Sequence, residues 1–366
     1  MVIHERVVML VDFDYFFAQC EELRNPALKD KPVVVGVYSG RTEDSGAVST
    51  ANYLAREYGV NSGLPLYLAK KRLKGTAAVF LPVDDEFYEQ ISNKIMRLLR
   101  GYANSFEQTS IDEAYLDVTE KTQSSFEVAR DLAQKMKNAV KIAVGITFSV
   151  GVGPNKLVAK IAADTQKPDG LTVVRPKELT LFLSPLSVNR LLGIGRKTAA
   201  KLSDLGVKTV GDLAKYDVQE LMDFFGKKLG VYFHNAANGV DNEPVQETGE
   251  AESISRISTL KENSRELMVV LEKTNQLIED IHKDIVQRNI SFKQVGIVAI
   301  LTDLSVRSRS KTLENTTRDA EIIRQAVREL FEKFLGESEL KIRRVGVKIS
   351  NLTREEVKQK RLTSFF

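Results

Sequence analysis

The stretch Ser110-Ile111-Asp112-Glu113-Ala114-Tyr115-Leu116-Asp117-Val118 decides the fold, because it places two adjacent carboxylates just before an apolar run. With Gln108-Thr109 in front of it, the stretch is typical of two antiparallel strands joined by a turn, with Asp112 and Glu113 at the tip. Adjacent acids in such a turn repel each other unless a positive charge lies nearby. The pattern therefore indicates a cation site.

A second segment has the same character. Val7 to Val11 is an uninterrupted run of strand-forming residues that ends at Asp12. Acids at the ends of neighbouring strands can converge on a hard divalent ion such as Mg²⁺, which takes oxygen ligands from a few carboxylates and from substrate phosphates. Taken singly, Asp12 is as well explained as a turn or helix-cap residue, and Asp112-Glu113 as solvated surface. Their joint occurrence within apolar sequence favours a metal site.

Composition limits the chemistry and the setting. The 366 residues are 43% hydrophobic and 28% charged, as in ordinary globular proteins, and the length predicts two to four domains. No apolar run reaches the roughly 18 residues that span a bilayer, and the N-terminus lacks a signal-peptide pattern, so we expect a cytoplasmic protein. The single Cys20 excludes an intrachain disulfide and a Cys-based zinc site, and the three scattered histidines argue against His-dependent catalysis. Carboxylates and lysines remain to carry any chemistry.

Charge is unevenly distributed along the chain. Residues 253–366 carry 22 Lys and Arg against 16 Asp and Glu, a net charge of +6, which leaves −2 on residues 1–252. An acidic part joined to a basic part is the asymmetry expected when one region binds metal and another binds a polyanion.

The order of the expected elements predicts an α+β fold, with an antiparallel sheet backed by helices, rather than a doubly wound dinucleotide-binding fold. The N-terminal elements are strands at 2–11, 33–35 and 143–146, the acidic hairpin, and helices at 15–24, 85–104, 124–141 and 156–164. Residues 240–253 are polar, acidic and broken by Pro and Gly, which is typical of an interdomain linker. A small α+β domain follows, with helices at 264–287 and 317–335 and strands at 294–301 and 341–350.

A candidate anion-binding face lies where a strand end at 47–49 passes into a helix. Thr50, Tyr53 and Arg56 fall at i, i+3 and i+6, so they share roughly one helical face. A hydroxyl, a phenol and a guanidinium on one side can hold a triphosphate. An amphipathic helix with a solvated Arg56 is the alternative.

The glycine-rich segment 148–156 precedes a helix. Its glycines permit close backbone approach to a ligand, and the helix N-terminus favours anions, although the Gly-Lys-Ser/Thr of a Walker loop is missing. We expect Lys160 and Lys167, which follow, to lie at the surface.

Two regions carry candidate DNA contacts. The hairpin Gly193-Ile194-Gly195, between two short helices and followed by Lys197, presents backbone N–H groups that can hold a DNA phosphate; plain helix packing is the alternative. In the C-terminal domain, Arg343-Arg344 beside alternating apolar residues suits a sheet edge presented to phosphates, against a merely solvated basic face. The basic residues of its expected outer strands are Arg256, Arg307, Arg309, Lys311, Lys341, Arg343, Arg344 and Lys348.

The chain ends in Gln359-Lys360-Arg361-Leu362-Thr363-Ser364-Phe365-Phe366. Two terminal phenylalanines expose apolar surface that a partner would cover, and the alternative is a tail folded back on its own domain.

With these segments in place, the chain resembles the Y-family, lesion-bypass DNA polymerases of the DinB branch, and archaeal members most closely. The resemblance covers residues 7 to about 350. It rests on five motifs in the family's order: Val11-Asp12-Phe13-Asp14-Tyr15-Phe16-Phe17-Ala18, Thr50-Ala51-Asn52-Tyr53-Leu54-Ala55-Arg56, Ser110-Ile111-Asp112-Glu113-Ala114-Tyr115, Ser149-Val150-Gly151-Val152-Gly153-Pro154-Asn155-Lys156 and Gly193-Ile194-Gly195. The tail separately resembles the box that docks such proteins on a PCNA-type sliding clamp, through Gln359, Leu362, Phe365 and Phe366.

The resemblance implies a right-hand fold in which each segment has a place. The expected parts are a palm of residues 1–15 and 83–174, fingers of 16–82, a thumb with a helix-hairpin-helix of 175–239, a linker of 240–252, a DNA-binding little finger of 253–351 and a tail of 352–366.

The resemblance also implies roles for particular residues. Asp12, Asp112 and Glu113 match the family's catalytic, metal-binding carboxylates, with the Phe13 carbonyl, around two Mg²⁺ ions that Mn²⁺ can replace. Phe17 matches the steric gate that excludes a 2′-hydroxyl, where many relatives carry Tyr. The residues matching the triphosphate site are Thr50, Tyr53, Arg56 and Lys167; those expected to contact DNA are Gly193, Gly195, Lys197, Arg307, Arg309, Arg343 and Arg344; and the small residues expected to line an open pocket over the nascent pair are Ala47, Ser49 and Gly63.

The implied function is low-fidelity, template-directed translesion synthesis by a monomer that uses primer-template DNA and deoxynucleoside triphosphates and lacks a proofreading exonuclease. Two alternatives stay open from the residues alone. One is a DNA-binding clamp adaptor with an inactive palm, and the other is a metal nuclease that uses the same acids.

Overall fold

The structure is a computed structural model that describes residues 5–247, 249 and 251–354. Its contacts divide the chain into two compact units: residues 1–36, 48–64 and 71–248 form the first, and residues 37–47, 65–70 and 249–366 the second. Within the described residues, no helix has the length and apolar character needed to cross a membrane. The clamp-binding residues expected in the tail, Gln359, Leu362, Phe365 and Phe366, lie outside the described residues.

A five-stranded sheet is the centre of the first unit, and its middle strand β1 (Val8–Phe13) is buried along its whole length. The strand order is β5-β6-β1-β7-β8, with β5 at Ser105–Gln108, β6 at Glu113–Asp117, β7 at Phe148–Gly153 and β8 at Leu171–Val173. Both strands next to β1 run antiparallel to it. Strands β5 and β6 also pair antiparallel, which confirms the expected hairpin and, with the neighbours of β1, the expected antiparallel α+β sheet.

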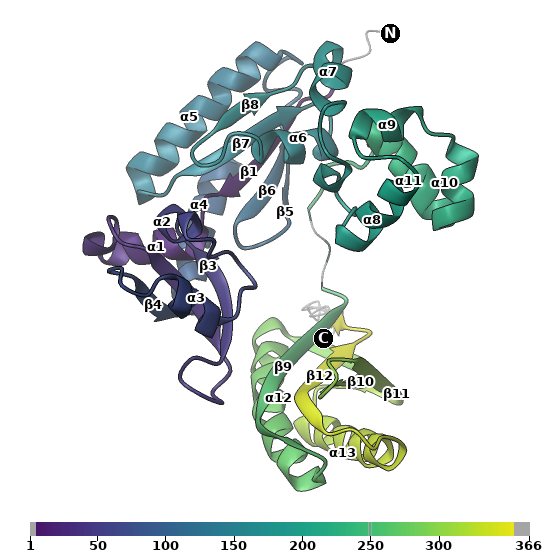
Figure 1. Ribbon diagram of the computed structural model, residues 1–366. Coiled ribbons are helices and arrows are strands. Elements are labelled where there is room, and N and C mark those ends of the chain that lie inside the picture. Colours follow the sequence, from purple (N-terminus) through teal and green to yellow (C-terminus); the bar gives the residue numbers. More distant parts are fainter. Residues whose placement is uncertain (1–4, 248, 250, 355–366) are drawn as a thin grey trace, which may run out of the picture. The chain divides into compact units, whose positions relative to one another are not determined.

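Helices cover both faces of this sheet (Figure 1). Since side chains alternate along a strand, Met9 and Val11 pack toward α4 (Asp85–Arg100) and α5 (Phe126–Val144), whereas Val8 and Leu10 pack toward α6 (Lys156–Ala163). Asp12 has the parity of Val8 and Leu10, so it lies on the α6 face.

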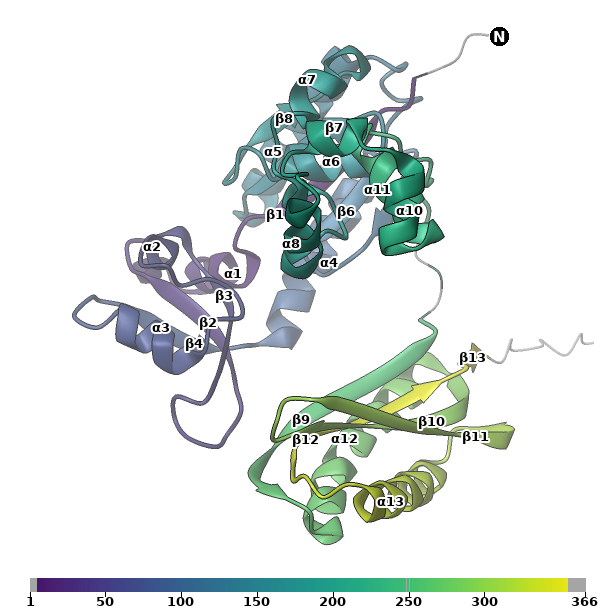
Figure 2. The same cartoon turned by 45° about the vertical axis from the view of Figure 1, so that its right-hand side comes forward.

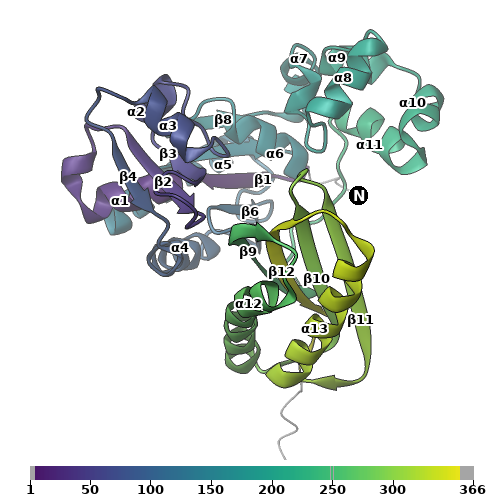
Figure 3. The same ribbon diagram turned by 60° about the horizontal axis from the view of Figure 1, so that its bottom comes forward.

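The remaining elements before residue 248 form a small sheet and a group of short helices. The small sheet has the order β3-β2-β4, from Gly46–Ala51, Val33–Tyr38 and Val79–Pro82, and the helices around it in sequence are α1 (Phe16–Arg24), α2 (Tyr53–Glu57) and α3 (Leu66–Arg72). The short helices gather in one group (Figure 3), and their apolar core includes Leu202, Val210 and Phe233. They are α7 (Leu179–Leu183), α8 (Arg196–Asp204), α9 (Val210–Lys215), α10 (Val218–Phe225) and α11 (Lys227–Ala237).

The second unit has a four-stranded antiparallel sheet with two long helices on one face (Figure 2). Its strand order is β11-β10-β12-β9, from Val306–Thr317, Ile290–Leu301, Ile342–Ser350 and Ser253–Ser264, and the short β13 (Thr353–Arg354) pairs with β10. The helices are α12 (Leu267–Arg288) and α13 (Ala320–Glu337). Among the described residues, no helix of this unit packs on the opposite face of the sheet.

The structure corrects the expected strand at 143–146. Helix α5 continues to Val144 and ends at Gly145, whose φ of +81° suits glycine, and the strand is β7 at Phe148–Gly153. Gly151 and Gly153 of this segment face helix α6. A Cβ on Gly151 would lie 2.0 Å from the Ala159 carbonyl oxygen, so this glycine lets α6 pack against the sheet.

Three smaller expectations are also corrected. Thr50 lies on strand β3, so the helical spacing that joined it to Tyr53 and Arg56 does not apply. A single 3-10 turn, Val188–Arg190, stands where a helix was expected before the Gly193 hairpin. Strand β12 lies between β10 and β9, so Arg343 and Arg344 are not on an edge strand. The outer strands expected to carry Arg256, Arg307, Arg309 and Lys311 are β9 and β11.

The expected linker is packed on the first unit over its first half. Val245 is 5% exposed and contacts the cluster of Leu10 and Tyr115. The Asp241 carboxylate accepts from the Leu157 N–H at 3.0 Å, at the start of α6. The polar residues in this part of the expected linker therefore make hydrogen bonds to the first unit.

Candidate active site

Three elements of the first unit bring two acids and a lysine together. Asp12 ends β1 and Glu113 begins β6, and the two residues are directly paired across the strands, so their side chains share the α6 face. Lys160 reaches them from α6: its ammonium donates to Asp12 Oδ2 at 3.0 Å and to a Glu113 carboxylate oxygen. Lys167, in the loop after α6, lies 2.6 Å from Asp12 Oδ1. A cation thus occupies the space between the acids.

Burial and charge separate the two acids in proton affinity. Burial alone would raise the pKa of Asp12, but its hydrogen bond with Glu113 and the ammonium groups of Lys160 and Lys167 lower it below its usual value. Burial and the neighbouring Asp12 raise the pKa of Glu113. Two carboxylates that share one site behave in this way, and a cation that binds both relieves their repulsion.

Asp112 is bonded to Phe13 through its main chain, but its side chain makes its hydrogen bond within its own loop. Its main-chain carbonyl accepts from the Phe13 N–H at 2.9 Å, and its Oδ1 accepts from the Ser110 hydroxyl at 2.6 Å. Among the described residues, accordingly, no three acidic, His or Cys side chains are gathered closely enough to form a ready metal cluster. The donor set still suits a hard cation: it consists of carboxylate oxygens, and two of the three already hold an ammonium.

A buried network fixes the loop that carries Lys167. Asp14, 1% exposed, accepts from the Ser149 hydroxyl at 2.8 Å and from the Asp169 N–H at 2.8 Å. Lys137 donates to Asp169 Oδ1 at 2.7 Å and to the Gly170 carbonyl at 3.1 Å. Burial raises the pKa of Asp14 against the effect of these hydrogen bonds. The loop position is therefore set from two strands and a helix.

An aromatic and cationic face adjoins the acids. The rings of Tyr15 and Tyr53 make an edge contact at 5.4 Å, and the Arg56 guanidinium lies 4.7 Å from the centre of the Tyr53 ring. Arg56 also donates to the Ala51 carbonyl at 2.9 Å. Burial and then the charge of Asp14 raise the pKa of Tyr53. Tyr53 also lies within electrostatic range of Lys167 and Asp12. Thr50 is half-buried on β3, and its side chain makes no hydrogen bond within the described residues.

Of the two adjacent phenylalanines on α1, only one reaches the surface. Phe16 is 2% exposed and packs on Phe13, with ring centres 5.1 Å apart, whereas Phe17 is half-buried. The structure therefore leaves Phe17 as the ring that can meet a ligand.

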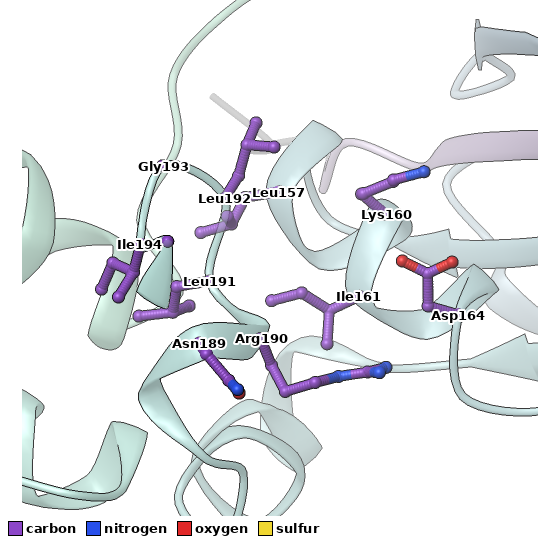
Figure 4. A pocket seen from close by; sticks show the side chains of 11 residues that line it. Leu157, Lys160, Ile161, Asp164, Asn189, Arg190, Leu191, Leu192, Gly193 and Ile194 are labelled. Carbon is purple, nitrogen blue, oxygen red and sulfur yellow. The ribbon is translucent and has the colours of Figure 1, made fainter. Parts of the chain in front are cut away.

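The Gly193 hairpin lines a pocket of about 380 Å³ that α6 closes on the other side (Figure 4). Leu157 and Ile161 contribute apolar surface, and in Figure 4 the charged ends of Lys160, Asp164 and Arg190 lie on the side of the view away from Gly193. Gly193 has a φ of +84°, and a Cβ on Gly195, the first residue before α8, would meet nothing within 4 Å. Lys197 is exposed on α8.

In the second unit, strand register decides which basic residues face which way. Arg307, Arg309 and Lys311 are paired with the buried Ala299, Ile297 and Val295, so they lie on the helix face. There Arg309 pairs with Glu337 at 3.0 Å and Lys311 with Glu329 of α13.

The open face of the same sheet carries other cations. Lys348 is paired with Gly296 and Arg344 with Ile300, positions that alternate with the core residues, so both lie on the face without helices. The Arg344 Nε is buried and has no hydrogen-bond partner within the described residues. Arg343 is the extra residue where the β10–β12 register shifts.

Comparison with known proteins gives this geometry a family. The impB/mucB/samB family profile matches residues 11–164, that of the same family's C-terminal domain matches residues 251–362, and that of a DNA polymerase-iota thumb domain matches residues 189–241. The chain is 44% identical to DNA polymerase IV of Nitrosopumilus maritimus, over 99% of both chains. It is 42% identical to DNA polymerase IV 1 of Methanosarcina mazei, over 96% of this chain and 97% of the relative.

Among solved structures, a Y-family DNA polymerase chimera of Dbh and Dpo4 superposes with a TM-score of 0.90 at 38% identity, covering 95% of this chain and all of that one. This chain belongs to the Y family of DNA polymerases. The Y-family polymerase described here is of the DinB type, a DNA-directed DNA polymerase with a thumb domain and a C-terminal little-finger domain. An insertion ternary complex of Dbh DNA polymerase matches with a TM-score of 0.69, also at 38% identity and with the same coverage.

Sequence reasoning misplaced the lysines near the acid pair of this polymerase and missed the role of Asp14. Lys160 and Lys167 were expected at the surface, yet Lys160 lies between Asp12 and Glu113, and Lys167 lies against Asp12. Asp14, with its network to the Lys167 loop, was quoted only as part of a motif. The available signal for Lys160 was its spacing of four from Lys156, which places both on one face of α6, and Lys156 likewise pairs with an acid of the sheet, Glu107, at 2.8 Å.

Proposed function

We propose that this polymerase performs low-fidelity translesion synthesis, adding deoxynucleotides to a primer 3′-hydroxyl at Asp12, Asp112 and Glu113. The observation that carries the proposal is the Asp12 and Glu113 pair, directly paired across two strands and holding a cation. An arrangement that keeps buried acids together against their repulsion suits a function that binds cations there.

Two Mg²⁺ ions at Asp12, Asp112, Glu113 and the Phe13 carbonyl would supply positive charge to activate the primer hydroxyl and stabilise the leaving pyrophosphate. Asp112 is oriented by Ser110, and rotation about its side-chain bonds would bring its oxygens toward the pair. Mn²⁺, which accepts the same oxygen ligands, can take the place of Mg²⁺.

The chain's own cations and aromatic rings would orient the incoming nucleotide. Lys167, fixed by the Asp14 network, and Arg56, fixed on the Ala51 carbonyl, would bind triphosphate oxygens with Tyr53 and Thr50. Phe17 would pack under the sugar and exclude a 2′-hydroxyl. Deoxynucleotides bound in this way have their triphosphate beside the acid pair.

We assign residues 1–15 and 83–174 to the palm, 16–82 to the fingers, 175–239 to the thumb and 253–351 to the little finger. The linker is shorter than the expected 240–252, because residues up to 247 pack on the first unit. Backbone N–H groups at Gly193 and Gly195, with Lys197, would hold a primer or template phosphate. The C-terminal tail would recruit the protein to a PCNA-type sliding clamp, and we propose that the protein lacks proofreading and acts as a monomer.

The test is incorporation of one labelled deoxynucleotide by the wild type, Asp112→Asn and Glu113→Gln, with and without Mg²⁺. The proposal requires metal-dependent incorporation by the wild type, loss by at least about a thousandfold in both variants, and unchanged primer-template binding. DNA binding without incorporation by the wild type would indicate an adaptor, and shortened primers would indicate a nuclease. Equal loss of incorporation and binding in the variants would indicate misfolding.

A further inference from the structure

The ring of Tyr88, from helix α4, lies directly behind Phe17. The two ring centres are 4.5 Å apart and the ring planes differ by only 17°, so the rings are stacked. Phe17 is therefore covered on one face by Tyr88, and its half-buried state leaves other parts of the ring accessible.

Tyr88 is itself fixed at both ends. The side chain is 0% exposed, and its hydroxyl donates to Glu21 Oε1 at 2.7 Å, on a carboxylate that is also buried. Phe17 and Glu21 are four residues apart on α1, so one residue of α4 contacts two neighbours on one face of α1, and Figure 3 shows the two helices beside each other. Burial and the Glu21 carboxylate raise the pKa of Tyr88, so its hydroxyl is a donor at neutral pH.

From this stack we infer that Tyr88 is a positioning residue for sugar discrimination, acting by fixing the plane of the Phe17 ring. The inference rests on the proposed steric-gate role of Phe17. A gate excludes a 2′-hydroxyl, one oxygen atom, only if its ring cannot move by a comparable distance. Tyr88 fills the space into which the Phe17 ring would otherwise tilt.

The effect of Tyr88 on sugar discrimination distinguishes this positioning role from general support of the fold. Removing the Tyr88 ring leaves a ring-sized space behind Phe17, and movement of Phe17 into it admits the ribose. A purely structural loss would lower the use of deoxynucleotides and ribonucleotides by the same factor. Only a change at the gate alters the ratio of the two.

The experiment measures kcat/KM for a deoxynucleotide and the matching ribonucleotide with full-length protein on primer-template DNA. Tyr88→Leu should lower the discrimination ratio about tenfold, equivalent to about 1.4 kcal/mol of differential transition-state stabilisation. Tyr88→Met, which is unbranched and adapts to irregular spaces, should lower the ratio as well and serves if the leucine variant does not fold. Tyr88→Phe keeps the ring and should keep the ratio within about twofold of wild type.

Two comparisons complete the test. Ile95→Ala, at another fully buried position two turns along α4, removes core contacts without a ring behind Phe17 and should leave the ratio unchanged. In Phe17→Ala, which should itself admit ribonucleotides, adding Tyr88→Leu should lower the ratio no further, because the two changes act through one ring.

Each outcome has one meaning. If Phe17→Ala admits ribonucleotides but Tyr88→Leu and Tyr88→Met keep the wild-type ratio, the positioning role is wrong and the gate stands. If Phe17→Ala also keeps the ratio, the proposed gate itself is wrong. If Ile95→Ala lowers the ratio as much as Tyr88→Leu, the effect comes from loss of packing in α4 and the inference fails.

Discussion

A lysine of the same chain bridges the acid pair. Lys160 donates to both Asp12 and Glu113, and its pKa is raised by these acids against the effect of burial. We expect this side chain both to stabilise the acid pair and to compete with a metal ion that binds the two carboxylates.

Lys160→Met should separate these two effects. Without metal, the free energy of unfolding should fall by about 1–3 kcal/mol, because a partly buried acid pair loses its cation. Mn²⁺ should bind about tenfold more tightly at about pH 8, where both acids are ionised. Calorimetry or Mn²⁺ resonance measures the affinity directly and needs no catalysis.

The matched control is Lys156→Met, on the same face of α6, whose ion pair with Glu107 is similarly buried but lies outside the acid pair. It should lose stability and keep the wild-type Mn²⁺ affinity. If Lys160→Met binds Mn²⁺ no more tightly than wild type does, the competition does not exist.

Some residues of the site could be predicted from the sequence and others could not. Asp12, Asp112 and Glu113 could be proposed as a set, because acids that interrupt apolar runs are unusual and the motif is family-specific. Lys160 could not, since a lysine on an amphipathic helix looks the same in sequence whether it faces water or an acid pair. The pairing of β1 with β6 and the packing of α6 over them had to be known first.

Helix α6 can reach the acids because strand β7 presents glycines to it. The Cβ of a residue at 151 would lie 2.0 Å from the Ala159 carbonyl oxygen and 2.2 Å from the Ala163 nitrogen, and both are backbone atoms that cannot yield. A glycine-rich segment before a helix suggested ligand binding. All six residues of β7 are buried, as expected of a strand packed on both faces, so its glycines serve helix packing.

Gly151→Ala should accordingly destabilise the first unit by about 2–4 kcal/mol through overpacking between β7 and α6. Urea unfolding measures this. Gly195→Ala is the control, since a Cβ there meets nothing within 4 Å, and it should change stability by no more than about 0.5 kcal/mol. Equal stability of Gly151→Ala and wild type would refute the close packing of α6 on the sheet.

The sheet of the second unit has one face for its helices and one face open, and the strand register distributes the basic residues between them. The sequence identified the charges and the outer strands that carry Arg256, Arg307, Arg309 and Lys311, which are β9 and β11. It did not give the register between the strands, and without the register the face on which a given arginine lies could not be assigned.

Lys348→Gln, on the open face, should weaken DNA binding by the full-length protein and lower the slope of log affinity against log salt by about 1, the loss of one phosphate contact. Lys311→Gln, on the helix face and paired with Glu329, is the matched control and should leave the slope unchanged. A larger loss in Lys311→Gln would place the DNA on the other face.

At the level of the whole chain, residues Asp241 to Glu247 are bonded to the first unit through Leu157, Glu107 and Arg100. This part of the expected linker therefore belongs to the first unit by its contacts.

The tail gives a prediction for the whole assembly. Replacing Phe365 and Phe366 by Ala should abolish stimulation of synthesis by a PCNA-type clamp, because these rings supply the apolar surface that a clamp would cover. Synthesis without clamp should be unchanged, which serves as the internal control. Stimulation that persists at equal clamp concentration would remove the tail from the proposed function.

The most direct test of the central claim is primer extension with Mg²⁺ and four deoxynucleotides on an undamaged template and on one with an abasic site, with Asp112→Asn alongside. We predict that the wild type extends both primers, past the lesion in the second, and that Asp112→Asn extends neither while still binding the DNA. Absence of extension by the wild type on both templates, with DNA bound, would contradict the account. So would undiminished extension by Asp112→Asn.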